Sequence, residues 1–267
     1  MNKPMGIILY KGKSQIDGKL IVAIATGFKD ESENKKTGAM IPVCIIRPDM
    51  PPIVAKKLGY DYSVCGNCKH RDFNSCYVNL CHGPENIFKA YHNDKYVSFK
   101  PEHLELFKDK MIRLGSYGDP SAIPIEIWDN ICKVAQGFTG YTHAWGAKYV
   151  SPDLKKYCMA SCDSLAEQIK AEAMGWRTFR IRGVDEVLKE NEFVCPASTE
   201  AGAKTTCSKC KACMGISSHT HKNPCIIVHG ADFKIDKFLA GMKKIKYKRQ
   251  YRVDFKKRYA NMTAIEV

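Results

Sequence analysis

Three short apolar segments stand near the start of the chain. These segments, Gly6–Tyr10, Lys19–Ala25 and Met40–Arg47, are rich in β-branched residues and lie beside glycine or proline, which predicts strands. The charged stretch from Asp30 to Gly38 predicts a loop. We therefore expect residues 1–39 to form an N-terminal group of strands that leads into a larger body.

Beyond residue 50, amphipathic segments alternate with apolar runs that end in polar residues. The amphipathic segments predict helices at Pro51–Tyr60, Pro84–Tyr91, Pro101–Lys110, Pro124–Gln136 and Ser164–Met174, the last closed by Gly175. The apolar runs predict six strands, which lead to Asp119, His143, Asp163, Arg182, Ser198 and His229. Such alternation implies a parallel sheet, and we expect an α/β fold built on a partial, TIM-like parallel β/α barrel.

Polar side chains at these strand ends predict a catalytic pocket, because the carboxyl ends of barrel strands converge on one mouth. The candidate catalytic residues are Asp119, His143, Ser161, Asp163, Arg180 and Arg182, and Cys195, Ser198 and His229 would share their pocket. The histidine and the aspartates are suited to proton transfer, and either arginine to binding an anion. The alternative is a doubly wound open sheet, in which such residues cap helices or satisfy loop backbone.

Thirteen cysteines in 267 residues add a second kind of chemistry. The count is odd and the core is large, so metal ligation explains the cysteines better than a disulfide framework. Five of them lie in apolar or strand-like contexts and are expected to be buried core residues. These five are Cys44, Cys132, Cys158, Cys162 and Cys225.

One group of cysteines, which we call the four-cysteine group, has the spacing of a cubane site. Cys207, Cys210 and Cys213 form a C-x-x-C-x-x-C run, and Cys195 at a strand end supplies a fourth thiolate. A tight turn can direct three sulfurs to three irons while a distant cysteine closes the fourth corner of a 4Fe-4S cluster. Structural zinc is the alternative, although its ligands usually come as two separated C-x-x-C pairs.

An earlier group, which we call the first group, is ambiguous. Cys65 and Cys68 form a C-x-x-C pair, and Cys76 and Cys81 follow within a cysteine-rich loop, residues 64–82. A pair with two later cysteines suits zinc as well as an iron-sulfur cluster. Spacing alone leaves both open, with zinc in place of a second cluster as the alternative.

Together, seven stretches of the chain resemble an uncharacterised family of phage and prophage proteins thought to carry iron-sulfur clusters. They are Val64–Cys68, Ser75–Asn79, Arg113–Pro120, Gly140–His143, Met159–Ser164, Gly175–Arg180 and Cys195–Ser198, and the similarity runs from about Lys36 to Gly230. The resemblance implies a barrel distantly similar to that of radical SAM enzymes. The C-x-x-x-C-x-x-C loop of those enzymes does not occur here, so cleavage of S-adenosylmethionine is not implied.

The family pattern also bears on the ligands. Cys65, Cys68 and Cys76 match it, as does the whole four-cysteine group, whereas Cys81, Cys158 and Cys162 fall where other residues are usual. Cys81 is therefore only a further candidate. A first group of three thiolates would leave one iron open to a substrate, a water or a side chain such as His82.

Net charge is concentrated at the end of the chain. Eleven lysines and arginines between Lys234 and Arg258 stand against two aspartates, which gives +9 of the net +14. Within this basic extension, residues 232–267, cations alternate with tyrosines in a pattern suited to phosphates and stacked bases. The candidate nucleic-acid contacts are Lys244, Lys246, Tyr247, Lys248, Arg249, Tyr251 and Arg252. The alternative is a solvated segment or a cover for the barrel.

We therefore expect a barrel core over residues 40–231, with the cluster loop at 195–213 and the basic extension after it. The start has no apolar stretch like that of a signal peptide and no apolar run is long enough to span a bilayer, so we expect a cytoplasmic protein, in the host cytoplasm if phage-encoded, with no membrane partner.

Three functions fit these expectations. The first is an iron-sulfur redox enzyme that acts on a small or anionic substrate at the barrel mouth and takes electrons from a donor. The second is a cluster-assisted hydrolase or lyase, for example on glycosides. The third is a non-catalytic nucleic-acid-binding protein with structural or redox-sensing clusters.

Overall fold

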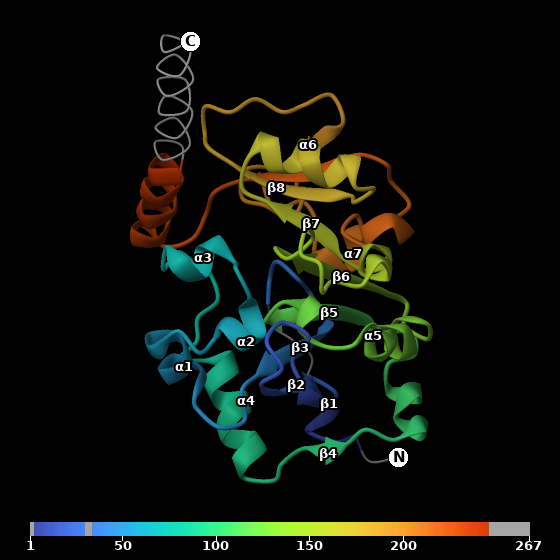
Figure 1. The fold of residues 1–267 in the computed structure, drawn as a ribbon. Helices are drawn as coiled ribbons and strands as arrows, with labels where there is room; N and C mark the ends of the chain where they lie inside the picture. Colours follow the sequence, from blue (N-terminus) through green and yellow to red (C-terminus); the bar gives the residue numbers. More distant parts are fainter. Residues whose placement is uncertain (1–2, 30–33, 246–267) are drawn as a thin grey trace, which may run out of the picture. The chain divides into compact units, whose positions relative to one another are not determined.

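The computed structural model describes residues 3–29 and 34–245 (Figure 1). The chain divides into two compact units. The sheet unit comprises residues 1–68 and 78–228, and the small unit comprises residues 69–77 and 229–267. The first group is thereby divided, since Cys76 belongs to the small unit and Cys65, Cys68 and Cys81 to the sheet unit.

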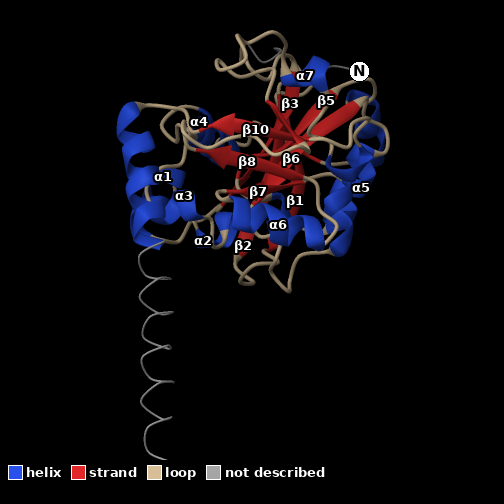
Figure 2. Cartoon of the chain, turned by 90° about the horizontal axis from the view of Figure 1, so that it is seen from above, coloured by secondary structure: helices blue, strands red, loops and turns tan. Residues whose placement is uncertain are grey.

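Ten strands form one sheet in the sheet unit (Figure 2). They are β1 (Gly6–Lys13), β2 (Leu20–Thr26), β3 (Met40–Ile46), β4 (Val97–Ser98), β5 (Met111–Tyr117), β6 (Gly137–Thr142), β7 (Met159–Cys162), β8 (Thr178–Arg182), β9 (Glu192–Val194) and β10 (Asn223–Ile227). Their order is β4-β1-β2-β3-β5-β6-β7-β8-β10-β9. Pairing is antiparallel between β1, β2 and β3 and parallel elsewhere. The prediction of an α/β fold with a mostly parallel sheet is confirmed.

Burial explains why the central strands are so apolar. Residues 21–25 of β2 and residues 43–46 of β3 are buried at every position, and not only at alternate ones. A strand covered on both faces has no polar side, as in sheets flanked by helices (Figure 2). The five cysteines expected in the core are all buried, which confirms that prediction.

Short helices connect the strands of the sheet unit. The α-helices are α1 (Pro52–Leu58), α2 (Tyr62–Cys65), α4 (Gly83–His92), α5 (Ile125–Cys132), α6 (Leu165–Ala173) and α7 (Cys207–Cys210), and the 3-10 helices are η1 (Pro101–Leu106), η2 (Pro120–Ala122), η3 (Pro152–Lys156) and η4 (Gly215–Ser217). Helix α6 begins where the Ser164 hydroxyl accepts the amide of Glu167, and Gly175 follows it with φ of 77°. None of the described helices is long and apolar enough to cross a membrane.

One predicted helix is wrong in type and length. The segment Pro101–Lys110 forms only the 3-10 helix η1, which ends at Leu106. Phe107 is then fully buried, and Lys108 forms a β-bridge with Ala135, so the chain is already turning toward β5. The apolar positions of this segment serve the core rather than one face of an α-helix.

The small unit pairs helix α3 (Lys69–Asp72) with the helix formed by residues 232–245. The His70 ring stacks on Phe238, with ring centroids 5.1 Å apart, and its Nδ1 lies 2.9 Å from the Ser75 hydroxyl. Gly241 lies so close to Phe73 that a Cβ there would meet the ring at 2.5 Å. Aromatic packing thus joins the two segments of this unit.

We expect Gly118→Ala to destabilise the sheet unit by roughly 3 kcal/mol. Gly118 follows β5 with φ of 86°, and a Cβ there would lie 2.7 Å from the Cβ of Ile45 and 3.0 Å from its carbonyl oxygen. Gly18 is the matched control, because its φ is 74° but its Cβ would meet nothing within 4 Å. Gly18→Ala should cost roughly 1 kcal/mol in urea unfolding. Equal costs for the two variants would contradict the packing argument.

Candidate functional site

The four-cysteine group is assembled from two segments of the sheet unit. Cys195 directly follows β9, and its amide donates to the carbonyl of Cys225 in β10 at 2.8 Å. The Ser198 hydroxyl donates back to the Cys195 carbonyl at 2.6 Å. This closed turn fixes one thiol at the carboxyl end of the sheet.

Helix α7 supplies the other thiols. Cys207 and Cys210 are its first and last residues, three positions apart and therefore on the same face. Lys211 has φ of 56°, which ends the helix and turns the chain toward Cys213. The helix is anchored by a loop, because the amide of Cys207 donates to the carbonyl of Lys36 at 2.9 Å.

Arg177 holds the segment that follows. Its guanidinium donates to the carbonyls of Ala212 at 2.9 Å and Gly215 at 3.1 Å, so a side chain just ahead of β8 fixes the backbone on both sides of Cys213. Burial lowers the pKa of Arg177, while the Cys213 thiol raises it.

The four thiols lie close enough to influence one another electrostatically. Burial raises the pKa of Cys195, Cys207 and Cys213, and neighbouring thiols of the group raise it further. Lys36 opposes this at Cys195, and Arg113 opposes it at Cys207.

Tyr141 of β6 completes the surroundings of the group. Its hydroxyl forms a side-chain hydrogen bond with Cys213 that lowers the pKa of the thiol. Burial first, and then the nearby thiols, raise the pKa of Tyr141 itself. Two cations and one phenol therefore face thiols that have little access to water.

The two metal alternatives require different spacings of the sulfurs. Tetrahedral zinc with Zn–S bonds of about 2.3 Å places its sulfurs about 3.8 Å apart. All four cysteines are among the described residues, and no three of their sulfurs lie within 4.8 Å of one another. A cubane interposes four irons and four sulfides, which requires a wider ring of thiolates.

A second constellation lies where β6 and β7 end. His143 directly follows β6, and its Nδ1 lies 3.5 Å from the Sγ of Cys68. Its Nε2 lies 3.8 Å from the Oδ1 of Asp163, which directly follows β7 and whose side chain is 1% exposed. Burial lowers the pKa of His143, but the Cys68 thiol and the Asp163 carboxylate outweigh this and raise it well above its usual value.

Asp119 holds the backbone of this constellation. One carboxylate oxygen accepts the amide of Ser121 at 3.0 Å and the other accepts the amide of His143 at 2.9 Å. Asp119 thus links the start of η2 to the end of β6, which favours a positioning role. Ser161 is buried in β7, and its carbonyl accepts the indole N–H of Trp145 at 3.1 Å.

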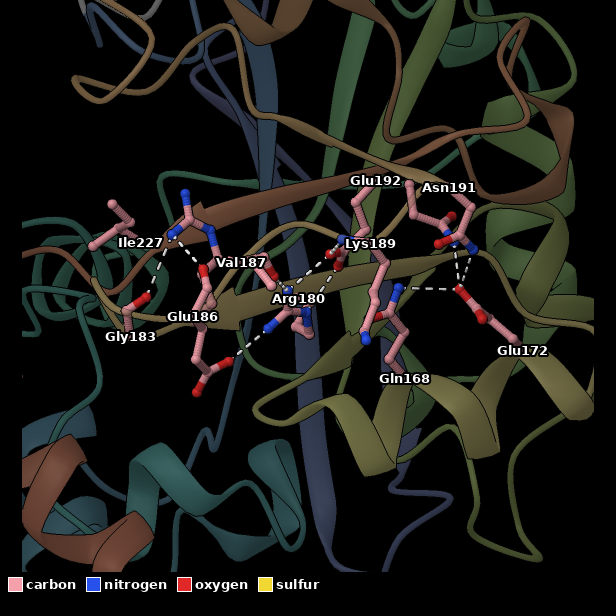
Figure 3. A network of polar contacts seen from close by, with 12 residues as sticks. Gln168, Glu172, Arg180, Gly183, Glu186, Val187, Lys189, Asn191, Glu192 and Ile227 are labelled. Atoms are coloured by element: carbon pink, nitrogen blue, oxygen red, sulfur yellow. Dashed lines mark hydrogen bonds and ion pairs between the residues drawn. The ribbon is translucent and has the colours of Figure 1, made fainter.

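The two candidate anion-binding arginines lie in internal ion pairs, and Figure 3 shows the contacts of Arg180. The Arg180 guanidinium binds both oxygens of Glu192 at 2.8 Å, and it also contacts Glu186 and the carbonyl of Val187. Arg182 donates to the carbonyl of Glu186 and pairs with Glu200. Burial would raise the pKa of Glu192, yet Arg180 holds it below its usual value. These contacts favour a structural role, and binding of an anionic substrate stays a prediction.

The other expected site residues are dispersed. Cys65 ends α2 and is half-buried, Cys81 is exposed, and Cys76 is half-buried in the small unit. His229 also belongs to the small unit. Of the candidate nucleic-acid contacts, Lys244 lies in the helix of residues 232–245. The others, Lys246, Tyr247, Lys248, Arg249, Tyr251 and Arg252, lie outside the described residues.

Sequence reasoning missed the shell around the thiols. Lys36, Arg113 and Tyr141 lie far from the four cysteines along the chain and show no ligand-like spacing. One signal could have identified Tyr141 as a site residue, because it lies in the stretch Gly140–His143, which contributes to the family resemblance. The contact between Cys68 and His143 spans 75 residues and has no local signature.

We expect Glu192→Ala to lower the free energy of unfolding by roughly 3–5 kcal/mol, because it leaves the Arg180 charge buried without its main partner. The side chains of Arg180 and Glu192 are 2% and 0% exposed. Glu186 is the matched control, since it pairs with the same arginine but is 55% exposed. Glu186→Ala should cost under about 1 kcal/mol in urea denaturation. A small effect of Glu192→Ala would mean that the buried pair contributes little.

Known proteins offer no assignment for this chain. No protein-family model, no curated protein and no solved structure matches it. A function must therefore be inferred from the chemistry of two sites in the sheet unit. These are the four-cysteine group and the contacts of His143 with Cys68 and Asp163.

Proposed function

We propose that this chain is an iron-sulfur protein whose four-cysteine group holds one 4Fe-4S cluster. The observation that carries the proposal is the convergence of four buried or half-buried thiols with sulfurs too widely spaced for one zinc ion. Three of them come from a C-x-x-C-x-x-C run and the fourth from a strand end. These residues fit a cubane in number, type and spacing.

The surrounding charges support the same assignment. A 4Fe-4S cluster with four thiolate ligands carries net negative charge, which is costly to bury without compensation. Lys36 and Arg113 are charge partners of the thiols, and Arg177 is a charge partner of Cys213. When bound, such a cluster supplies one-electron transfer, and its potential depends on burial and on hydrogen bonds to its sulfurs.

The strand order favours a partial β/α barrel over a doubly wound sheet. The order of β9 and β10 is exchanged at the edge of the sheet, whereas β3, β5, β6, β7 and β8 follow one another in chain order. A doubly wound sheet reverses its strand order at a switch point, and this stretch has no reversal. From the sequence resemblance alone, we likewise propose a phage or prophage protein that works in the host cytoplasm.

Among the enzymatic alternatives, the contacts favour redox chemistry. Hydrolysis by paired carboxylates needs two carboxylates directed at the substrate, whereas both oxygens of Asp119 accept backbone amides. Asp163 and His143 are the remaining proton-transfer groups at these strand ends, and Tyr141 contacts the four-cysteine group two residues before His143. We therefore propose that a substrate at these strand ends receives electrons from the cluster, which an external donor reduces.

Reconstitution of anaerobically purified protein with ferrous iron and sulfide tests the cluster. We expect the four-cysteine group to take up about four irons and four sulfides per chain. Cys210→Ala should abolish this uptake, because it removes one corner ligand. Cys132→Ala is the control, since Cys132 is buried in helix α5 and belongs to the core. Uptake of one zinc ion without sulfide by the four-cysteine group would overturn the proposal.

Tyr141→Phe should lower the reduction potential of this cluster by about 20–60 mV. The hydrogen bond of Tyr141 to Cys213 stabilises the more negative, reduced state, and a hydrogen bond of ~0.5–1.5 kcal/mol converts to that range for one electron. Tyr157→Phe is the matched control, because the Tyr157 hydroxyl hydrogen-bonds Asp129 instead. Redox titration followed by electron paramagnetic resonance measures both. A raised or unchanged potential in Tyr141→Phe would contradict the assigned hydrogen bond.

A further inference from the structure

The contact between Cys68 and His143 has the geometry of a thiol–imidazole pair. The Nδ1 of His143 lies 3.5 Å from the Sγ of Cys68. Sulfur is larger than oxygen, so its hydrogen bonds to nitrogen are longer than the about 2.9 Å usual between nitrogen and oxygen. A thiol placed in this way can pass its proton to the ring and become a thiolate, which is the nucleophilic form of cysteine.

A single metal ion explains this contact less well. The family resemblance places Cys68 among the ligands of the first group. Among the described residues, however, Cys68 belongs to no set of three candidate ligand atoms within 4.8 Å of one another. Cys76, a further thiol of the first group, belongs to the small unit. The chemistry of the Cys68 thiol itself is therefore the better basis for an inference.

We propose that Cys68 is an activated thiol that reduces a small peroxide, with His143 as its proton acceptor and Asp163 as the carboxylate that positions the ring. All three residues belong to the sheet unit. None of them is part of the four-cysteine group, so this site goes beyond the cluster proposed above and does not depend on it.

Asp163 stands where a triad has its orienting carboxylate. Its side chain is 1% exposed, and its Oδ1 lies 3.8 Å from the Nε2 of His143, the ring nitrogen remote from Cys68. Such contacts are often long without a substrate and shorten when one binds. Asp119 restrains the same residue from its backbone, because it accepts the amide of His143. The imidazole is thus held between a thiol and a buried carboxylate.

Electrostatics favour the charged form of this ring. Burial lowers the pKa of His143, but the Cys68 thiol and the Asp163 carboxylate outweigh it and raise the pKa well above its usual value. An imidazolium beside sulfur stabilises the thiolate, and a carboxylate behind the ring stabilises the imidazolium. The order thiol, imidazole, carboxylate is that of an activated nucleophile.

Access and proton balance favour a peroxide as the substrate. Cys68 is half-buried and the His143 side chain is 22% exposed, which suits a small electrophile. Acyl transfer would also need donors arranged around an oxyanion, whereas a peroxide needs only a proton for its leaving oxygen.

The proposed step balances without a further reactant. The thiolate sulfur attacks one peroxide oxygen, the O–O bond breaks, and the leaving hydroxide takes from His143 the proton that the thiol gave up. A thiol and hydrogen peroxide thereby become a sulfenic acid and water. The sulfur is oxidised by two electrons and the peroxide is reduced by the same two.

Cys81 provides an internal comparison, because it lies in the same cysteine-rich loop and is exposed whereas Cys68 is half-buried. On access alone Cys81 would react first. A free cysteine is only a few per cent thiolate at pH 7, so we expect Cys68 of the folded wild-type protein to react with iodoacetamide about tenfold faster than Cys81. Mass spectrometry of peptides after brief anaerobic labelling measures both rates in one sample. Faster labelling of Cys81, or protection of Cys68 that a chelator removes, would overturn the proposal.

Hydrogen peroxide at an amount equal to that of the protein tests the substrate. We expect a sulfenic acid at Cys68, trapped by dimedone, before any forms at Cys81. An adduct that forms first at Cys81, or none at Cys68, would reject peroxide reduction by this thiol.

Variants assign the proton acceptor and the positioning carboxylate. His143→Ala should lower the alkylation rate of Cys68 about tenfold and leave that of Cys81 unchanged, which shows that the loop is intact. His219→Ala is the matched control, because His219 is an exposed histidine of the same unit. Asp163→Asn should slow Cys68 several-fold, and Asp163→Glu should restore part of the rate because it returns the carboxylate. An unchanged rate of Cys68 in His143→Ala would contradict the assignment.

The outcomes also separate this site from the cluster. A fast reaction of Cys68 in a protein that takes up no iron and sulfide would uphold this site and reject the cluster. Uptake of about four irons and sulfides with a slow Cys68 would uphold the cluster and reject this site.

Discussion

The parallel pairing of β6 between β5 and β7 is the constraint on which both thiol constellations depend. Leu114 of β5 lies beside Gly140, and Tyr141 lies beside Met159 of β7. In this register β6 ends level with Ala160, two residues before the end of β7, and the side chains of His143 and Asp163 approach to 3.8 Å although they are twenty residues apart in sequence. Because side chains alternate between the faces of a strand, a slip of one residue would turn Tyr141 away from Cys213. Apolar burial of the strands thus fixes the geometry of polar groups at their ends.

Much of this arrangement could be predicted from the sequence, because strands and thiol ligands have local signatures. Glycine, β-branched runs and polar endings located the strands except β4, and the C-x-x-C-x-x-C run indicated the cluster loop but not helix α7. Partners far apart in sequence carry no such signature. From the sequence, Arg180 was a candidate anion-binding group. In the structure its main partner is Glu192, because the crossover from β8 to β9 brings the two side chains together. The split of the first group between two compact units was also invisible, since it depends on the packing of residues 69–77 with residues beyond 228.

Asp119 illustrates how burial changes the meaning of a residue type. As a sequence position it is an acid at the end of a strand, which is typical of a catalytic group. In the folded chain it is buried, and each oxygen accepts a backbone amide that would otherwise lose its hydrogen bond with water. A carboxylate satisfied in this way stabilises the turn after β5 and the end of β6. Its role is to position His143, whose backbone amide it accepts.

The two-residue interval between Tyr141 and His143 has an electrical consequence. Successive strand residues advance by about 3.3 Å, so Tyr141, beside the proposed cluster, and His143, beside Asp163, are close neighbours at the end of β6. Two unit charges 15 Å apart at an effective dielectric constant of 20 still interact by about 1 kcal/mol. An electron added to the proposed cluster would therefore favour protonation of the His143 imidazole, and thermodynamic reciprocity requires that a proton bound there make the proposed cluster easier to reduce. Uptake of an electron by the proposed cluster and uptake of a proton at the end of β6 would then favour each other.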